Sequence, residues 1–272
     1  MEEFNITDLK KLYVPLRDSH KGQNGKLMVI GGSILFHAAS LWSLKIASRI
    51  VDMVFYSSVD SNNIIVQKEK EEFMDGIIVP RDKIEHYIDE ADVVLIGPGL
   101  PRENGIEKGD DDTKVLTENL LQKYKNKKWV VDGGSLQVIK PEILPSSSII
   151  TPHHQEFKTL FGLEPTFENA KKMAKKYDIT ILLKGEEDLV ANKEKSVIIK
   201  GGNQGMTKGG TGDVLAGLTA SLYCKNDAFL SASSASYVNK KSGESLYETM
   251  GLYYNSSDLT NEIPKIMKEL IL

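Results

Sequence analysis

The feature that most constrains this chain is an alternation between short, wholly apolar segments and longer segments with helical spacing. The short segments are rich in aliphatic residues and include residues 27–30, 93–96, 129–131 and 179–183. Strands that are apolar on both faces are typical of parallel sheets, because helices cover both sides of such sheets. We therefore predict an α/β fold with a central, mostly parallel sheet and helices on both faces.

The longer segments supply the helices of this prediction. Apolar residues recur at helical spacing over residues 37–50, and a strand at residues 53–56 follows directly. Further helices are expected near residues 113–125, 154–162, 167–177, 212–224, 227–250 and 257–271. Because we find neither an interdomain linker nor an internal repeat, residues 1–272 are expected to form one domain.

Two segments interrupt the alternation. Residues 101–112 have no apolar periodicity, so we expect a surface loop that either orders around a ligand or stays mobile. Residues 184–200 contain two short apolar runs separated by the polar residues 192–195, which is typical of a hairpin.

Composition excludes several classes of protein. The chain has 34 Lys and Arg against 38 Asp and Glu, a net charge of −4, whereas nucleic-acid binding favours a basic excess. Cys224 is the only cysteine, so an intrachain disulfide is impossible, and we expect it to be a small buried hydrophobe. The N-terminus is acidic rather than basic, and no apolar run reaches the roughly 18 residues of a membrane span. We expect a cytoplasmic protein with neither membrane nor nucleic-acid contacts.

A glycine-rich segment indicates an anion site. Residues 201–213 contain six glycines and lead directly into an apolar helix. A loop of this kind directs unpaired backbone N–H groups and the positive end of the helix dipole at one point. The glycine spacing matches neither a Walker A loop nor a dinucleotide-binding fingerprint.

Asp213 is the unusual residue of this segment. A carboxylate in the first helical turn would repel a phosphate bound at the glycine loop. Its sign and position suit a general base that accepts a hydroxyl proton during phosphoryl transfer. A helix-capping acid after a flexible loop is the alternative interpretation.

Residues 149–156 form a second candidate site, where a strand ends and Pro152 opens a helix. Glu156, in the first turn, could hold the water shell of a Mg²⁺ ion that bridges nucleotide phosphates. His153 would then face a substrate, whereas His154 is expected to face solvent. An acidic residue in a first turn is also favourable for helix-dipole reasons alone.

Further polar or glycine-bearing segments follow other predicted strands. They are residues 184–188, 97–100, 131–134 and 25–33, and each of them could equally be a simple turn. In an open parallel sheet, however, the carboxyl ends of the strands share one edge. Their convergence there is what an α/β active site requires.

These residues, in this order, resemble the ATP- or ADP-dependent NAD(P)H-hydrate dehydratases, a branch of the ribokinase-like superfamily. The resemblance extends from about Lys21 to the last helices. It rests on the segments 21–33, 97–100, 151–157, 183–188 and 202–217. Thr151-Pro152-His153, where several related kinases carry Thr-Pro-Asn, indicates the dehydratase branch.

The resemblance implies a role for each matching residue. Asp213 would be the catalytic base, and the anion hole would consist of Gly209, Gly210, Thr211 and Gly212. The nucleotide would contact Lys184, Gly185, Glu186, Glu187, Asp188, Asn203 and Gly212. The substrate would contact Ala38, Gly99, Asp132, His153 and Asp213, and Glu156 would bind Mg²⁺ through water.

The implied reaction is the repair of NADH or NADPH that has added water to its ring, with ATP or ADP as phosphoryl donor. A separate NAD(P)H-hydrate epimerase would act on the same pool, and the resemblance also implies a homo-oligomer. The chain departs from the family at residues 34–40 and 132–136, both on the substrate side. Two alternatives therefore remain: a kinase of the same fold that phosphorylates a small alcohol, such as a vitamin precursor or a sugar, and a nucleotide-binding protein without turnover.

Overall fold

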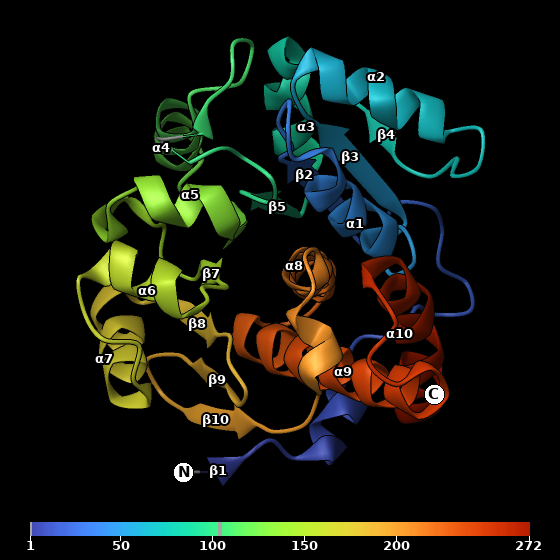
Figure 1. Cartoon of the computed structure of the whole chain (residues 1–272), viewed down its shortest axis with the longest axis vertical. Coiled ribbons are helices and arrows are strands. Elements are labelled where there is room, and N and C mark those ends of the chain that lie inside the picture. Colours follow the sequence, from blue (N-terminus) through green and yellow to red (C-terminus); the bar gives the residue numbers. More distant parts are fainter. Residues whose placement is uncertain (1, 103–104) are drawn as a thin grey trace.

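A ten-stranded, mostly parallel sheet with helices on both faces organises the chain, as the sequence predicts (Figure 1). The computed structural model describes residues 2–102 and 105–272. The strand order is β1-β10-β9-β8-β7-β6-β5-β2-β3-β4. Neighbouring strands are parallel, except that β9 runs antiparallel to both β8 and β10.

The strands are β1 (Glu2–Glu3), β2 (Lys26–Ile30), β3 (Met53–Ser57), β4 (Ile77–Ile78), β5 (Val93–Ile96), β6 (Lys128–Val131), β7 (Ile149–Ile150), β8 (Thr180–Leu183), β9 (Asp188–Ala191) and β10 (Ser196–Ile199). The α-helices are α1 (His37–Ala47), α2 (Asp60–Glu69), α3 (Ile84–Glu90), α4 (Thr113–Lys123), α5 (Gly133–Val138), α6 (His154–Phe161), α7 (Phe167–Tyr177), α8 (Thr211–Tyr223), α9 (Ala228–Met250) and α10 (Ser256–Ile271).

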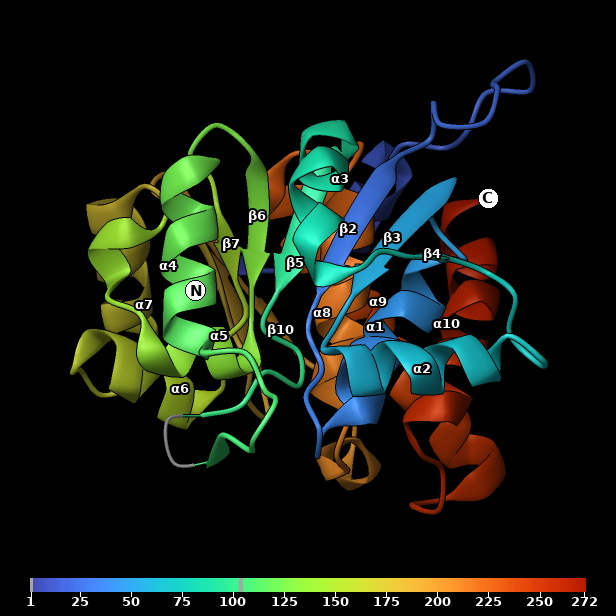
Figure 2. The same ribbon diagram turned by 90° about the horizontal axis from the view of Figure 1, so that it is seen from above.

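Two apolar layers sandwich the sheet. Side chains of α1, α8, α9 and α10 pack on one face, and those of α3 to α7 pack on the other (Figure 2). Alternate residues of one strand enter different layers: Leu27 and Val29 of β2 point to the first, and Met28 and Ile30 to the second. This arrangement explains why the strands are apolar throughout.

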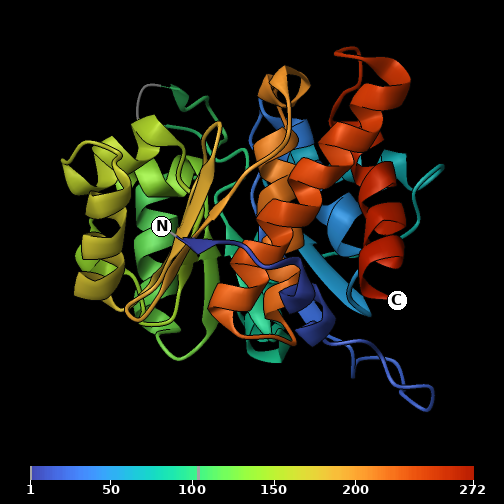
Figure 3. The same cartoon turned by 90° about the horizontal axis from the view of Figure 1, so that it is seen from below.

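The predicted hairpin forms the end of the sheet nearest the N-terminus. β9 and β10 pair antiparallel, with Ser196 opposite Ala191. Figure 3 shows β1 lying against β10, where Glu2 pairs with Val197 in parallel register. The sequence did not predict β1, because two exposed glutamates carry no strand pattern.

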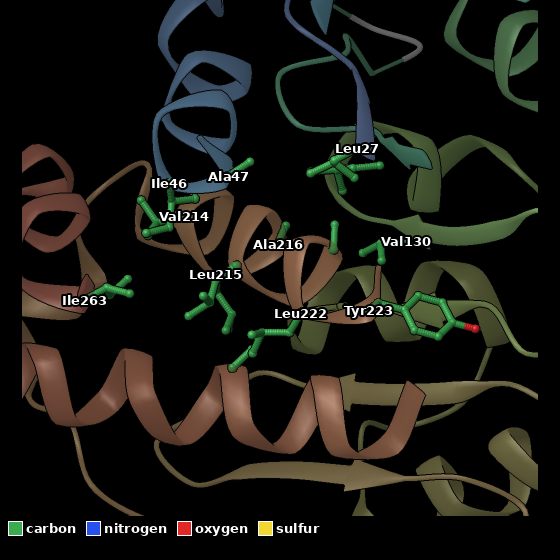
Figure 4. Packing of buried hydrophobic residues seen from close by; sticks show 14 of the residues in the cluster. Leu27, Ile46, Ala47, Val130, Val214, Leu215, Ala216, Leu222, Tyr223 and Ile263 are labelled. Carbon is green, nitrogen blue, oxygen red and sulfur yellow. The ribbon is translucent and has the colours of Figure 1, made fainter. Parts of the chain in front are cut away.

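Helix α8 is the most buried helix of the first layer. Its residues 214–223 are all buried, and Figure 4 shows Val214, Leu215 and Ala216 of this helix pointing toward different neighbours. Gly217 permits the close approach of α1, since a Cβ atom there would lie 2.7 Å from both the Ser43 Cα and the Ile46 Cγ2. The core therefore fixes the position of the helix that follows the glycine loop.

The predicted helices are present, with small shifts at their ends. The helix predicted over residues 37–50 ends earlier, because α1 stops at Ala47. Residues 48–51 form turns instead. Helices α2, α3 and α5 were not predicted, because they have few buried positions and so show little apolar periodicity. Cys224 is buried and free, as predicted.

The surface loop predicted over residues 101–112 includes Glu103 and Asn104, which lie outside the described residues. Its second half is attached to the body of the protein. The Asp110 carboxylate accepts a hydrogen bond from the Ile34 N–H at 2.8 Å, and Asp111 forms an ion pair with Arg81 at 2.6 Å. None of the helices in the described part of the chain is both long and apolar enough to cross a membrane.

The close contact at Gly217 yields a stability prediction. Gly217→Val would insert a branched side chain between α1 and α8, so the free energy of unfolding should fall by about 2 kcal/mol. Urea denaturation measures this change. Gly105→Val is the control, because a Cβ atom at Gly105 would meet nothing within 4 Å. An equal, small effect of both substitutions would contradict the described packing.

Candidate active site

The segments singled out in the sequence lie at one edge of the sheet. They follow β2, β5, β6, β7, β8 and β10, which all run in the same direction. Their carboxyl ends therefore share one side of the molecule. The convergence that the sequence predicts is thus present in the fold.

A cavity of about 710 Å³ opens at the end of this edge that is near β8 and β10. Its walls are the turn at residues 184–188, the loop at residues 200–207, the first turns of α8 and two residues of α9. All seven residues predicted to contact a nucleotide line it: Lys184, Gly185, Glu186, Glu187, Asp188, Asn203 and Gly212. The volume lies within the usual range for small-molecule sites.

Several lining residues were not predicted. Gln204, Met206 and Thr207 lie within the glycine-rich segment 201–213 and Lys200 directly precedes it, but none of them was assigned a contact with a ligand. Leu215 of α8 lies within the matching segment 202–217, whereas Asn239 and Lys240 of α9 lack any local signature. Only tertiary structure brings α9 to the cavity.

A buried ammonium group links the ends of three strands. The Nζ of Lys184, after β8, donates to the Oδ1 of Asp132, after β6, at 2.8 Å. The Thr151 hydroxyl, after β7, donates to the same carboxylate oxygen at 2.7 Å. The second carboxylate beside the ammonium is that of Glu156, with its Oε2 3.9 Å from Nζ.

This charged group also reaches the first turn of α8. A Cβ atom at Gly212 would lie 3.5 Å from the Lys184 Nζ. The neighbouring carboxylates outweigh the effect of burial and raise the pKa of Lys184, so the side chain is a permanent cation. A cation and the unpaired N–H groups of a helix start together form a strong site for an anion.

Contacts with distant parts of the chain hold the glycine loop. Gly210 has a φ of +95°, and a Cβ atom there would lie 2.2 Å from the Trp42 ring, so only glycine fits. The Ser256 hydroxyl donates to the Gly209 carbonyl at 2.8 Å. The Thr211 hydroxyl donates to the Met206 carbonyl at 2.7 Å, so this hydroxyl hydrogen is already used within the loop.

His153 and Glu156 form a capping box at the start of α6. The Nδ1 of His153 accepts from the Glu156 N–H at 3.2 Å, and the Glu156 Oε2 accepts from the His153 N–H at 2.9 Å. Glu156 thus stabilises the start of the helix, in line with the alternative interpretation of a first-turn acid, and its carboxylate also lies near the ammonium of Lys184. His154 is exposed, as expected.

The predicted substrate residues Ala38 and Gly99 lie at the point where the strand order reverses. The chain adds β3 and β4 on one side of β2 and then β5 on the other. Ligands of open α/β sheets bind at such a switch point. A Cβ atom at Gly99 would lie 2.7 Å from the Phe36 carbonyl oxygen, so this loop lies close to the start of α1, whose first turn exposes Ala38.

Asp213 lies between these two regions. It directly follows Thr211 and Gly212, which line the cavity, and its backbone carbonyl accepts a hydrogen bond from the Ser43 hydroxyl of α1 at 2.7 Å. Burial and the nearby carboxylate of Asp132 raise the pKa of Asp213 to about 7, although Lys184 opposes the shift. A carboxyl group with this pKa can exchange a proton near neutral pH.

Comparison with known proteins identifies relatives along the sequence. A family model described as NAD(P)H-hydrate dehydratase matches residues 27–265. The bifunctional NAD(P)H-hydrate repair enzyme Nnr of Methanocaldococcus jannaschii is 37% identical, over 96% of this chain and 52% of that protein. The ADP-dependent (S)-NAD(P)H-hydrate dehydratase of Cenarchaeum symbiosum is 32% identical, over 96% of this chain and 95% of that protein. The chain therefore spans about half the length of the first relative and nearly all of the second.

Solved structures share the fold. A ribokinase-like superfamily protein from Enterococcus faecalis has a TM-score of 0.86 at 22% identity, covering 99% of this chain and 96% of its own. The ADP/ATP-dependent NAD(P)H-hydrate dehydratase from Bacillus subtilis, co-crystallized with ATP and Mg²⁺, has a TM-score of 0.82 at 20% identity. The match covers 99% of this chain and 98% of that protein's chain. The predicted fold class is confirmed as ribokinase-like.

The raised pKa of Asp213 predicts a pH-dependent stability. The folded protein keeps a proton on this group that the unfolded chain releases near pH 4, so the free energy of unfolding falls as pH rises from about 4 to about 7. Asp213→Asn removes this loss. Its free energy of unfolding should exceed that of the wild type by about 1 to 2 kcal/mol at pH 8, and the difference should shrink at pH 5.

Urea denaturation at the two pH values measures the difference. Asp60→Asn, at an exposed position in the first turn of α2, is the matched control. A difference for Asp213→Asn that is identical at pH 5 and pH 8 would contradict the raised pKa.

Proposed function

The chain belongs to the NAD(P)H-hydrate dehydratase family, and on this basis we propose that it restores NADH or NADPH from the hydrated forms, using the phosphoryl group of ATP or ADP. The observation that carries the proposal is the position of Asp213. Asp213 directly follows Thr211 and Gly212, which line the cavity. Its backbone carbonyl also accepts a hydrogen bond from Ser43 of α1, the helix that begins next to the switch point. A base at this position can serve a nucleotide on one side and a hydroxyl group on the other.

In the proposed first step, the ring hydroxyl of the hydrate attacks the terminal phosphorus of the nucleotide. Asp213 accepts the hydroxyl proton, a new P–O bond forms, and the bond to the leaving nucleotide breaks. Loose phosphoryl-transfer transition states need positioning and charge stabilisation more than a strong base. The N–H groups at the start of α8 and the ammonium of Lys184 would supply that stabilisation.

In the proposed second step, the lone pair of the ring nitrogen expels inorganic phosphate. Loss of a proton from the adjacent ring carbon then restores the dihydronicotinamide. Phosphorylation matters because hydroxide is a poor leaving group and phosphate is a good one. The balanced products are NAD(P)H, inorganic phosphate and the nucleotide shortened by one phosphoryl group.

Glu156 fits the proposed role of binding Mg²⁺ through water. Its two oxygens each accept one hydrogen bond, from the His153 N–H and from the Gln137 amide, and each retains a lone pair for a coordinated water. Mg²⁺ in nucleotide sites is usually held by one or two carboxylates together with the phosphates, and it keeps several waters. When bound, the ion would neutralise charge on the transferred phosphoryl group.

We further propose Ala38, Gly99, Asp132 and His153 as residues of the substrate side. Asp132 would act mainly through Lys184, because its carboxylate is buried and already accepts two hydrogen bonds. A hydrate epimerase that acts on the same pool is also part of the proposal, since the Methanocaldococcus jannaschii relative is named a bifunctional repair enzyme. A homo-oligomeric state and a cytoplasmic location stay predictions.

A direct assay tests the function. Purified protein is mixed with NADH hydrate, Mg²⁺ and either ATP or ADP, and the near-ultraviolet absorbance of the intact dihydronicotinamide is followed. We expect a rise that requires the nucleotide. A stable phosphate ester in place of NADH would instead indicate a kinase for a small alcohol, and nucleotide binding without turnover would indicate a binding protein.

The role of Asp213 yields a prediction in the same assay. Asp213→Asn should lower the rate by at least about a hundredfold, because general-base catalysis contributes on the order of 10² or more, while nucleotide binding persists. Glu168→Gln, in the first turn of α7, is the matched control for loss of one first-turn acid. A wild-type rate in Asp213→Asn would contradict the assignment of the base.

A further inference from the structure

Lys240 is a buried charge that the proposed chemistry does not use. It lies on α9, and its side chain is only 7% exposed. The Nζ atom donates to the Glu186 carbonyl at 2.8 Å and to the carbonyls of Gly185 and Gly201 at 3.3 Å each. The nearest carboxylate oxygen, the Oδ1 of Asp188, is 3.6 Å away.

The three carbonyls belong to opposite walls of the cavity. Gly185 and Glu186 are in the turn between β8 and β9, whereas Gly201 follows β10. The antiparallel pairing of β9 with β10 joins the two walls as far as Asp188 and Ile199. Beyond that pair, one ammonium group connects the two segments directly.

Two more residues on the same face of α9 each form a hydrogen bond with one of the two walls. Ser236, four residues before Lys240, donates its hydroxyl hydrogen to the Oδ2 of Asp188 at 2.7 Å. Glu244, four residues after it, accepts at its Oε1 from the Gly202 N–H at 3.0 Å. Residues four apart share one face of a helix, so α9 presents a polar row to the cavity.

A lysine suits this position for a physical reason. An ammonium group has three donors and no acceptor, and three backbone carbonyls converge on it here. A buried ammonium is tolerated only when it is fully hydrogen-bonded. Carbonyls that turn toward Lys240 are not left as unpaired acceptors, which would repel the phosphates of a nucleotide.

We propose that Lys240 is a positioning residue for the nucleotide: it fixes the separation of the two cavity walls, so that ADP or ATP meets a preformed site. This inference rests on the proposed function, because that function places the nucleotide in the cavity. Lys240 acts through backbone groups and does not itself contact the reacting atoms. Loss of its ammonium should weaken nucleotide binding and leave the substrate side intact.

Lys240→Met keeps most of the side-chain volume and removes the charge. Isothermal calorimetry with ADP and Mg²⁺ should show a dissociation constant raised about tenfold, which is the size expected when one charge-assisted hydrogen-bond group is lost. The dissociation constant for NADH, followed by its fluorescence, should change less than about twofold. Lys265→Met, at an exposed lysine of α10, is the matched control and should change neither constant.

Each other outcome is informative. An unchanged dissociation constant for ADP, or an equal loss of affinity for ADP and NADH, would overturn the positioning role. If Lys240→Met does not fold, Glu244→Ala replaces it. This variant should raise the dissociation constant for ADP about threefold. An unchanged constant would overturn the role of this face of α9 in positioning the nucleotide. A wild-type protein that binds neither ADP nor ATP would overturn the proposed function as well, which separates the two failures.

Discussion

The candidate site depends on one buried cation. The ammonium of Lys184 lies between the carboxylates of Asp132 and Glu156 and beside Gly212 in the first turn of α8. Without this ammonium, the acidic side chains of Asp132, Glu156 and Asp213 would be buried close together, and their repulsion and desolvation would oppose folding. With it, the ends of β6 and β8 and the starts of α6 and α8 are held in one arrangement. The same positive charge that stabilises this arrangement is available to a phosphoryl group.

The hydrophobic core fixes the other half of the site. Helix α8 is surrounded by apolar neighbours, and Gly217 lets α1 approach it closely (Figure 4). The start of this helix cannot shift without disturbing the core, so the glycine loop and Asp213 are presented by a rigid element, as catalytic positioning requires. The cost appears at Asp213, whose burial beside Asp132 raises its pKa to about 7. A buried carboxyl group with a raised pKa is consistent with the proposed catalytic role and is unnecessary for a simple helix cap.

Much of the fold and of the candidate site could be predicted from the sequence, because these parts depend on local patterns. Apolar runs indicated β2, β5, β6 and β8, and the glycine-rich motif together with residues 184–188 indicated the walls of the cavity. The order of the strands was not predicted, because it is set by packing between segments far apart in the chain. Trp42, Ser256 and Lys240 were missed for the same reason: each acts on the loops of the site from another helix. The antiparallel strand β9 was expected only as part of a hairpin, and its pairing with β8 places the turn at residues 184–188 beside the glycine loop.

The proposed mechanism requires that the ring hydroxyl leaves as part of phosphate and not as water. NADH hydrate labelled with ¹⁸O in that hydroxyl tests it directly when it is turned over with Mg²⁺ and the preferred nucleotide, and the released inorganic phosphate is analysed by mass spectrometry. We expect one ¹⁸O atom in each phosphate formed, because the ring C–O bond breaks after the P–O bond has formed. Unlabelled phosphate, with the ¹⁸O recovered in water, would contradict phosphoryl transfer to the substrate and the role of Asp213 as the base that promotes it.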